Sequence, residues 1–274
     1  MDIRIVNTCN NDCLYCLESS LRNKDKFISK DSLFTIISKE KDKSNITFFW
    51  WNPLLHPDLK EIIYHSYKEW FCWIGLLSNT QGISKKYLWE LITEWLSTFW
   101  IYFNSFDKKN HEIVNWWWIS YEDYLHNLKL LAVSWINLKI IIHINDLNIN
   151  TVARDVLILR EKYWFTNFDF INYFPFDKPY LNKNLLEYNI QDNAKQIELI
   201  FKVVKKFSLK VNFMKFSKDF FSYFTEYYNY ERGVLNQIWE EDIERLNWKW
   251  TPFCYKEKRC EQCFIKDNCR YYGI

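Results

Sequence analysis

The chain has 274 residues, with 36 basic and 34 acidic side chains and a formal net charge of +2. This near balance creates no strong field that would favour nucleic acid or a membrane surface as a partner. The sequence begins without a basic segment followed by an apolar one, and it has no uncharged apolar run of about 18 residues, so we expect neither a signal peptide nor a membrane span. A cytoplasmic protein is the resulting expectation.

Strand-like and helix-like segments alternate along most of the chain. Strands are predicted at residues 2–6, 46–49, 74–78, 101–105, 138–144, 167–171 and 209–213. Helices are predicted at residues 30–40, 57–69, 84–94, 120–133, 151–163 and 192–207. This alternation predicts βαβ units and a parallel sheet in an α/β fold, and by itself it suits a partial barrel or a doubly wound sheet equally well.

Three cysteines follow the first predicted strand closely. Cys9, Cys13 and Cys16 form the pattern C-x3-C-x2-C in CNNDCLYC. A disulfide framework is a poor explanation for a chain of this length without an export signal. A structural zinc site usually takes four ligands, and no histidine lies near this group. Thiolates also hold iron–sulfur clusters, in which three ligands would leave one iron open to a substrate or cofactor. Cys72 stands alone in an apolar stretch, and we expect it to be a small buried hydrophobe.

Tryptophan stands where glycine is expected. The chain has 4 glycines and 15 tryptophans, and together they approach the share of about 7% that glycine alone usually has. Trp70, Trp135 and Trp164 each lie between a predicted helix and the next strand, where glycine is favoured. We hypothesise that many tryptophans occupy glycine sites, through a stop codon that the source reads as glycine. A protein rich in aromatic residues, in its core or on a stacking surface, is the alternative.

The first cysteine group resembles that of the radical S-adenosylmethionine (SAM) superfamily, with the aromatic Tyr15 just before the last cysteine. The resemblance implies that Cys9, Cys13 and Cys16 hold a [4Fe–4S] cluster whose open iron binds the amino and carboxylate groups of SAM. It also implies a partial (β/α)6 TIM-like barrel with parallel strands. A zinc site without SAM chemistry is the alternative.

Segments that follow other predicted strands also resemble motifs of this family. The segment WWNPLLHP resembles its Gly-Gly-Glu-Pro signature, whose glycine backbone approaches SAM. Trp50 and Trp51 then stand at the glycine positions, and Asn52 stands where glutamate is common. After the fourth and fifth strands, the resemblance places Ser105 and Asn145 near SAM. Together with Tyr15, these residues are the predicted cofactor contacts.

Other polar residues at strand ends have a simpler explanation, because such residues often form caps or turns. Asn79 lies in SNTQG, which resembles the family's Thr-Asn-Gly turn, and Asp107 lies in NSFD. Lone histidines are usually structural, and we expect this role for His111 and His143. No catalytic residue is predicted.

The carboxyl end carries a second cysteine group. Its C-x2-C-x5-C core resembles part of the SPASM or twitch extension, which holds auxiliary iron–sulfur clusters. The resemblance implies one auxiliary [4Fe–4S] cluster, with zinc as the alternative. Its ligands would be Cys254, Cys260, Cys263 and Cys269. We expect a radical SAM core domain at residues 1–210 and a cysteine-rich extension at residues 211–274.

The sequence therefore favours an enzyme that cleaves SAM to a 5′-deoxyadenosyl radical, which abstracts hydrogen from a substrate. A peptide substrate is favoured by analogy with the tail, and RNA or a small metabolite is the alternative. An electron donor such as flavodoxin or ferredoxin is the expected protein partner. An alternative of another class is a non-catalytic iron–sulfur or zinc protein for binding or electron transfer.

Overall fold

The computed structural model describes residues 1–17, 19, 27–49, 51–115, 119–174, 177–190, 192–214 and 216. Trp50 and the four carboxyl-terminal cysteines, for which SAM and cluster contacts are predicted, lie outside these residues. Within the described part, no helix has both the length and the apolar character needed to cross a membrane.

One parallel sheet forms the centre of the molecule, and its strands follow the order of the chain. The strands are β1 (Asp2–Arg4), β2 (Asn45–Phe49), β3 (Trp73–Ser78), β4 (Thr98–Phe103), β5 (Asn137–Ile144), β6 (Asn167–Asn172) and β7 (Lys210–Met214). Because β1 and β7 lie at opposite edges, the sheet is an open barrel. The predicted partial TIM-like barrel is therefore confirmed.

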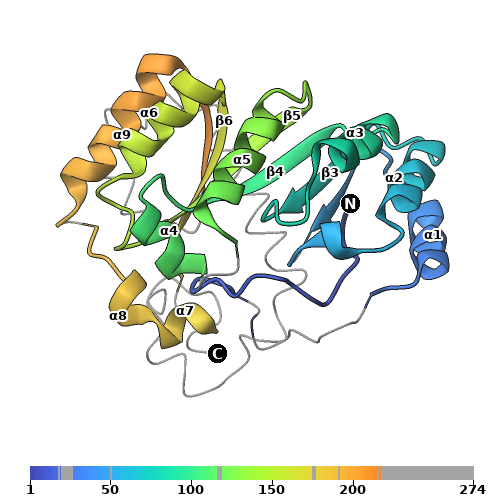
Figure 1. Cartoon of the computed structure of the whole chain (residues 1–274), viewed down its shortest axis with the longest axis horizontal. Coiled ribbons are helices and arrows are strands. Elements are labelled where there is room, and N and C mark those ends of the chain that lie inside the picture. Colours follow the sequence, from blue (N-terminus) through green and yellow to red (C-terminus); the bar gives the residue numbers. More distant parts are fainter. Residues whose placement is uncertain are drawn as a thin grey trace.

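Helices connect the strands, and the long helices lie outside the curved sheet, whereas α7 and α8 lie beyond the strand ends (Figure 1). The helices are α1 (Lys30–Lys39), η2 (Pro53–Leu55), α2 (Leu59–Lys68), α3 (Lys85–Thr93), α4 (Lys108–Asn115), α5 (Tyr121–Ala132), α6 (Val152–Tyr163), α7 (Lys178–Leu181), α8 (Lys183–Leu186) and α9 (Ala194–Phe207). Serine side chains cap three of them by accepting a backbone N–H of the first turn: Ser29 at α1, Ser84 at α3 and Ser120 at α5.

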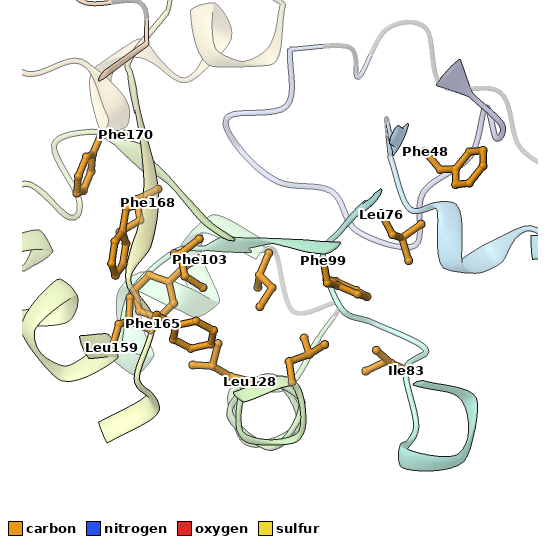
Figure 2. Packing of buried hydrophobic residues seen from close by; sticks show 14 of the residues in the cluster. Phe48, Leu76, Ile83, Phe99, Phe103, Leu128, Leu159, Phe165, Phe168 and Phe170 are labelled. Atoms are coloured by element: carbon orange, nitrogen blue, oxygen red, sulfur yellow. The ribbon is translucent and has the colours of Figure 1, made fainter. Parts of the chain in front are cut away.

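The core lies between the sheet and these helices. β4 alternates, so that Phe99, Ile101 and Phe103 are buried while the residues between them face the barrel interior. Figure 2 shows Phe99 and Phe103 beside Leu128 of α5, which is also fully buried. This apolar layer fixes the strands, and their carboxyl ends meet at one rim of the open barrel.

Several tryptophans have a backbone that side chains rarely adopt. The φ angles are positive at Trp51 (48°), Trp70 (68°), Trp95 (77°), Trp135 (61°) and Trp164 (65°). Positive φ is the region that glycine enters without steric penalty. The expectation that positions 70, 135 and 164 suit glycine is therefore confirmed at the level of the backbone.

Three of these positions close a helix. After Trp164, the N–H of Phe165 donates to the carbonyl of Leu159, six residues back, at 3.2 Å. After Trp70 and Trp95, the next residue donates its N–H to a carbonyl five residues back, as in Phe71 to Ser66 at 3.2 Å. This is the Schellman arrangement, in which glycine is preferred at the left-handed position. Cys72, which was expected to be buried, is exposed, because it lies in the surface connection between α2 and β3.

Candidate cluster and cofactor site

The segment with the first three cysteines lies at the rim formed by the strand ends. Cys9, Cys13 and Cys16 are half-buried, and a turn joins two of them, with the N–H of Cys16 donating to the carbonyl of Cys13 at 3.1 Å. In Figure 1 this dark-blue segment passes close to α4 and α7. We call residues 9–17 the cysteine loop.

Two helices hold the cysteine loop. The N–H of Leu14 donates to the carbonyl of Val114 in α4 at 3.0 Å. Lys178, at the start of α7, donates to the carbonyl of Asp12 at 2.9 Å and pairs with its carboxylate at 2.6 Å. The loop is therefore attached to elements far away in the sequence.

Asparagine amides surround two of the cysteines. Nδ2 of Asn79, just after β3, lies 3.8 Å from Sγ of Cys9. Oδ1 of Asn115, the last residue of α4, lies 3.7 Å from Sγ of Cys13 and accepts from Nδ2 of Asn11 at 3.0 Å. Polar groups next to the sulfurs are a common feature of thiolate metal sites, because they orient the ligands.

Tyr15 anchors the loop in the barrel interior. Its hydroxyl donates to Oδ1 of Asn104 at the end of β4, and its ring stacks on His143 of β5 with centroids 4.4 Å apart and planes at 11°. Burial raises the pKa of Tyr15 well above its usual value, and the nearby Cys13 adds to this effect. The phenol therefore stays neutral and acts as a hydrogen-bond donor.

Asn52 joins the cysteine loop to the strand ends. It is fully buried, and its Nδ2 donates to Oδ1 of Asn10 and to the carbonyl of Gln81, both at 2.9 Å. Its Oδ1 accepts from the hydroxyl of Ser78 at 2.7 Å. A glutamate here would have no hydrogen to donate when ionised, so the amide suits the two acceptors that it faces.

Trp51, beside it, fits its surroundings poorly. The indole packs against the core, and the Arg4 guanidinium lies 4.7 Å from its ring centroid. Its Nε1 is buried and has no hydrogen-bond partner within the described part of the chain. An unpaired buried donor and a positive φ both disfavour tryptophan, and a glycine at position 51 would remove both penalties.

Two further predicted contacts form local hydrogen bonds. The hydroxyl of Ser105 donates to Asp155 of α6 at 2.8 Å and accepts from the N–H of Asp107 at 2.9 Å. Oδ1 of Asn145 accepts from the N–H of Leu147 at 3.1 Å. Both residues lie at the same rim as the cysteine loop, and their contact with SAM stays a prediction.

A small pocket opens between the carboxyl ends of β5 and β6. Its lining includes Tyr15, His143, Asn145, Asn172 and Tyr173. Burial lowers the pKa of His143 to about 4, so that its imidazole is neutral near pH 7. The pocket therefore combines aromatic faces with neutral hydrogen-bonding groups beside the cysteine loop.

The three cysteines of the loop fit the donor set of a multi-iron cluster. In the described residues, no three side chains of histidine, cysteine, aspartate or glutamate come close enough together to hold one metal ion. In a four-iron cluster each cysteine binds a different iron, so the sulfurs need not converge on one point. Three half-buried thiols on one preformed loop match that requirement.

Some residues of this site were not predicted. Asn115 and Lys178 reach the cysteine loop across 102 and 166 residues of sequence, so no local pattern marks them. Asn104 and Asn10 were also missed, although Asn104 lies at a strand end, which is a recognisable signal.

Comparisons with known proteins give the same fold. The model of the radical SAM superfamily matches residues 3–156, whereas no curated protein matches the chain. The crystal structure of Streptococcus suis SuiB bound to precursor peptide SuiA is 13% identical, with a TM-score of 0.64, and the match covers 82% of this chain and 51% of SuiB.

Two more solved structures are similar. Native anSMEcpe with bound AdoMet and the Kp18Cys peptide is 13% identical, with a TM-score of 0.62 over 77% of this chain and 63% of that one. The FeFe-hydrogenase maturase HydG from Carboxydothermus hydrogenoformans is 14% identical, with a TM-score of 0.59, and the match covers 82% of this chain and 56% of HydG. The chain thus spans about half to two thirds of these proteins.

Proposed function

The chain belongs to the radical SAM superfamily, and from this premise we propose that it is an enzyme whose [4Fe–4S] cluster is held by Cys9, Cys13 and Cys16. The observation that supports this most directly is the cysteine loop itself. Its thiols are half-buried at the rim of the barrel, and hydrogen bonds with α4, α7 and the strand ends hold the loop in place.

When bound, the cluster and SAM would supply the chemistry, in which one electron would cleave SAM to methionine and a 5′-deoxyadenosyl radical that abstracts hydrogen from the substrate. The chain orients these groups and excludes water. Tyr15 and Asn145 line the pocket next to the loop, while Asn52 and Ser105 lie at the same rim. We propose these four residues, with the backbone at positions 50 and 51, as the SAM contacts.

The tryptophan at position 51 conflicts with this role. Its indole packs against the apolar core and near the Arg4 guanidinium, in space that a glycine would leave open. The proposal therefore includes glycine as the functional residue at positions 50 and 51. This makes the activity of the glycine variant the decisive measurement.

The test uses anaerobically reconstituted protein with Trp50→Gly and Trp51→Gly, reduced with dithionite and given SAM. We expect 5′-deoxyadenosine and methionine in equal amounts by mass spectrometry. The variant that also carries Cys13→Ala should form neither product. A protein that binds iron and sulfide but makes no 5′-deoxyadenosine would contradict the enzyme proposal and favour an electron-transfer role.

For the substrate, we propose a peptide. The support is the similarity of the fold to SuiB bound to precursor peptide and to anSMEcpe bound to a peptide. RNA or a small metabolite is the alternative substrate, and a flavodoxin or ferredoxin is the proposed electron donor in the cytoplasm.

We also propose an auxiliary [4Fe–4S] cluster on Cys254, Cys260, Cys263 and Cys269, in an extension that follows a core domain of residues 1–210. The proposal rests on the cysteine spacing. Iron analysis should give about eight irons per chain, because the proposal requires two four-iron clusters. About four irons with one zinc would instead indicate a zinc site.

A further inference from the structure

Two asparagines present opposite ends of their amides to two cysteines of the loop. Nδ2 of Asn79 lies 3.8 Å from Sγ of Cys9, whereas Oδ1 of Asn115 lies 3.7 Å from Sγ of Cys13. We propose that these amides tune the reduction potential of the cluster in opposite directions: Asn79 stabilises the reduced form and Asn115 the oxidised form. This inference rests on the proposed function, since it requires a cluster on the loop.

Neighbouring backbone groups fix the orientation of Asn79. Its Oδ1 accepts from the N–H of Gln81 at 3.0 Å, and a backbone N–H can only donate. Its Nδ2 therefore points the other way, to Sγ of Cys9 and to Oδ1 of Asn10 at 3.3 Å. Turning the amide over would break the bond to Gln81.

The orientation of Asn115 is fixed in the same way. Its Nδ2 donates to the carbonyl of His111 at 3.1 Å, which can only accept. Its Oδ1 accepts from Asn11, whose own amide is oriented by the N–H of Asp12 at 3.0 Å. Asn11 and Asn115 are each 2% exposed, so water cannot replace these bonds at low cost.

The two contacts have opposite electrostatic effects. Reduction adds negative charge to the cluster, and part of it resides on the cysteine sulfurs. An N–H that points at Cys9 stabilises this charge, whereas an amide oxygen that faces Cys13 destabilises it, because a metal-bound thiolate has no hydrogen to donate. The low dielectric of the buried site strengthens both effects.

The test compares three leucine variants of the reconstituted protein. Leucine has nearly the shape of asparagine without its polar end, so Asn79→Leu removes the donor and Asn115→Leu removes the acceptor. Asn137→Leu, at the exposed start of β5, is the matched control. The measurement is the midpoint potential, from an anaerobic redox titration followed by the electron paramagnetic resonance signal of the reduced cluster.

We expect a more negative midpoint potential for Asn79→Leu and a less negative one for Asn115→Leu. Each shift should correspond to a roughly fivefold change in the equilibrium constant for reduction of the cluster. Asn137→Leu should match the parent protein. Asn115→Asp keeps an oxygen and adds charge, so it should shift the potential opposite to Asn115→Leu. If a leucine variant fails to hold a cluster, the alanine variants allow the same comparison.

Equal shifts in one direction for both variants, or no shift in either, would overturn the inference. Loosening of the loop alone would shift both midpoint potentials in the same direction, so only opposite shifts support the role of the two amides. The outcome is separable from the proposed function. A parent protein without iron and sulfide rejects the cluster itself. SAM cleavage by the protein with Trp50→Gly and Trp51→Gly, together with asparagine variants whose potentials do not separate, rejects only the role of the two amides.

Discussion

At the scale of single residues, several tryptophans have a backbone conformation that disfavours any side chain. Tryptophan is among the bulkiest side chains, yet it stands at positive φ at Trp70, Trp95, Trp135 and Trp164. These side chains are more than half exposed, with Trp135 97% exposed, so burial does little to compensate the strain. The fold therefore requires a left-handed backbone at these positions, and it does not require the tryptophan side chains.

This view predicts that Trp164→Gly stabilises the protein. Removing the left-handed strain should raise the free energy of unfolding by about 1 kcal/mol, reduced slightly by the lost contact with Arg160. Urea unfolding provides the measurement. Trp89→Gly is the matched control, because Trp89 lies inside α3 and glycine there should destabilise by about 0.5 kcal/mol. A loss of stability in Trp164→Gly would contradict the glycine-site hypothesis.

A buried histidine gives a second prediction at this scale. His111 is fully buried, and burial lowers its pKa from 6.5 to about 4. Between these pH values the unfolded chain binds a proton that the folded chain does not, so stability rises with pH through this window and is complete above it. The effect amounts to roughly 3 kcal/mol between pH 7 and pH 4.

Urea unfolding of the parent and of His111→Gln at pH 7.5 and pH 4.5 checks this expectation. The parent should lose much more stability than the variant on acidification. The remaining loss in the variant includes His143, whose pKa is lowered in the same way. Equal losses in the two proteins would show that His111 is charged or solvated in the folded state.

At the scale of elements, periodicity predicted the long segments well. All seven predicted strands and the six predicted helices are present, with ends that differ by a few residues. The structure adds η2, α4, α7 and α8, which are short. α4 was missed because its sequence, KKNHEIVN, is too polar to show an apolar stripe, although its last residue reaches the cysteine loop.

A polar contact across three strands was also missed, because strand pairing is not visible in one sequence. Lys139 of β5 pairs with Asp169 of β6 at 2.7 Å, and Asn212 of β7 donates to the same carboxylate at 2.7 Å. The carboxylate side chain is 10% exposed. Burial raises the pKa of Asp169, although Lys139 acts in the opposite direction.

We predict that Asp169→Leu lowers the free energy of unfolding by about 3 kcal/mol, because it leaves the Lys139 ammonium in the barrel without its counter-charge. The double variant with Lys139→Met should recover most of this loss, since no unpaired charge remains. Thermal and urea unfolding would measure both. A double variant no more stable than Asp169→Leu would show that the pair itself stabilises the sheet.

At the scale of the whole molecule, the open barrel explains which part of the site was predictable. Cys9, Tyr15 and Asn52 lie on loops after strands, so the family pattern and the parallel topology place them at one rim. Asn115 and Lys178 reach that rim only through the packing of α4 and α7 on the cysteine loop. Contacts over such sequence separations follow from the complete fold and not from any local pattern.

The contact of Lys178 with Asp12 therefore offers a test of how the distant part of the chain holds the cysteine loop. Lys178→Met removes the ion pair and the bond to the carbonyl of Asp12. Because the pair is partly exposed, global stability should change by less than about 1 kcal/mol. The loop itself should open more often, which would increase hydrogen exchange of its amides in the metal-free protein.

In the reconstituted protein, the same variant should lose iron to a chelator several-fold faster than the parent. Lys183→Met, an exposed lysine in α8, is the matched control and should leave both exchange and iron release unchanged. Faster exchange throughout the sheet would indicate general destabilisation. Unchanged exchange in the loop would mean that α4 and the strand ends are sufficient to hold it, since Leu14 and Cys9 keep their bonds to those elements.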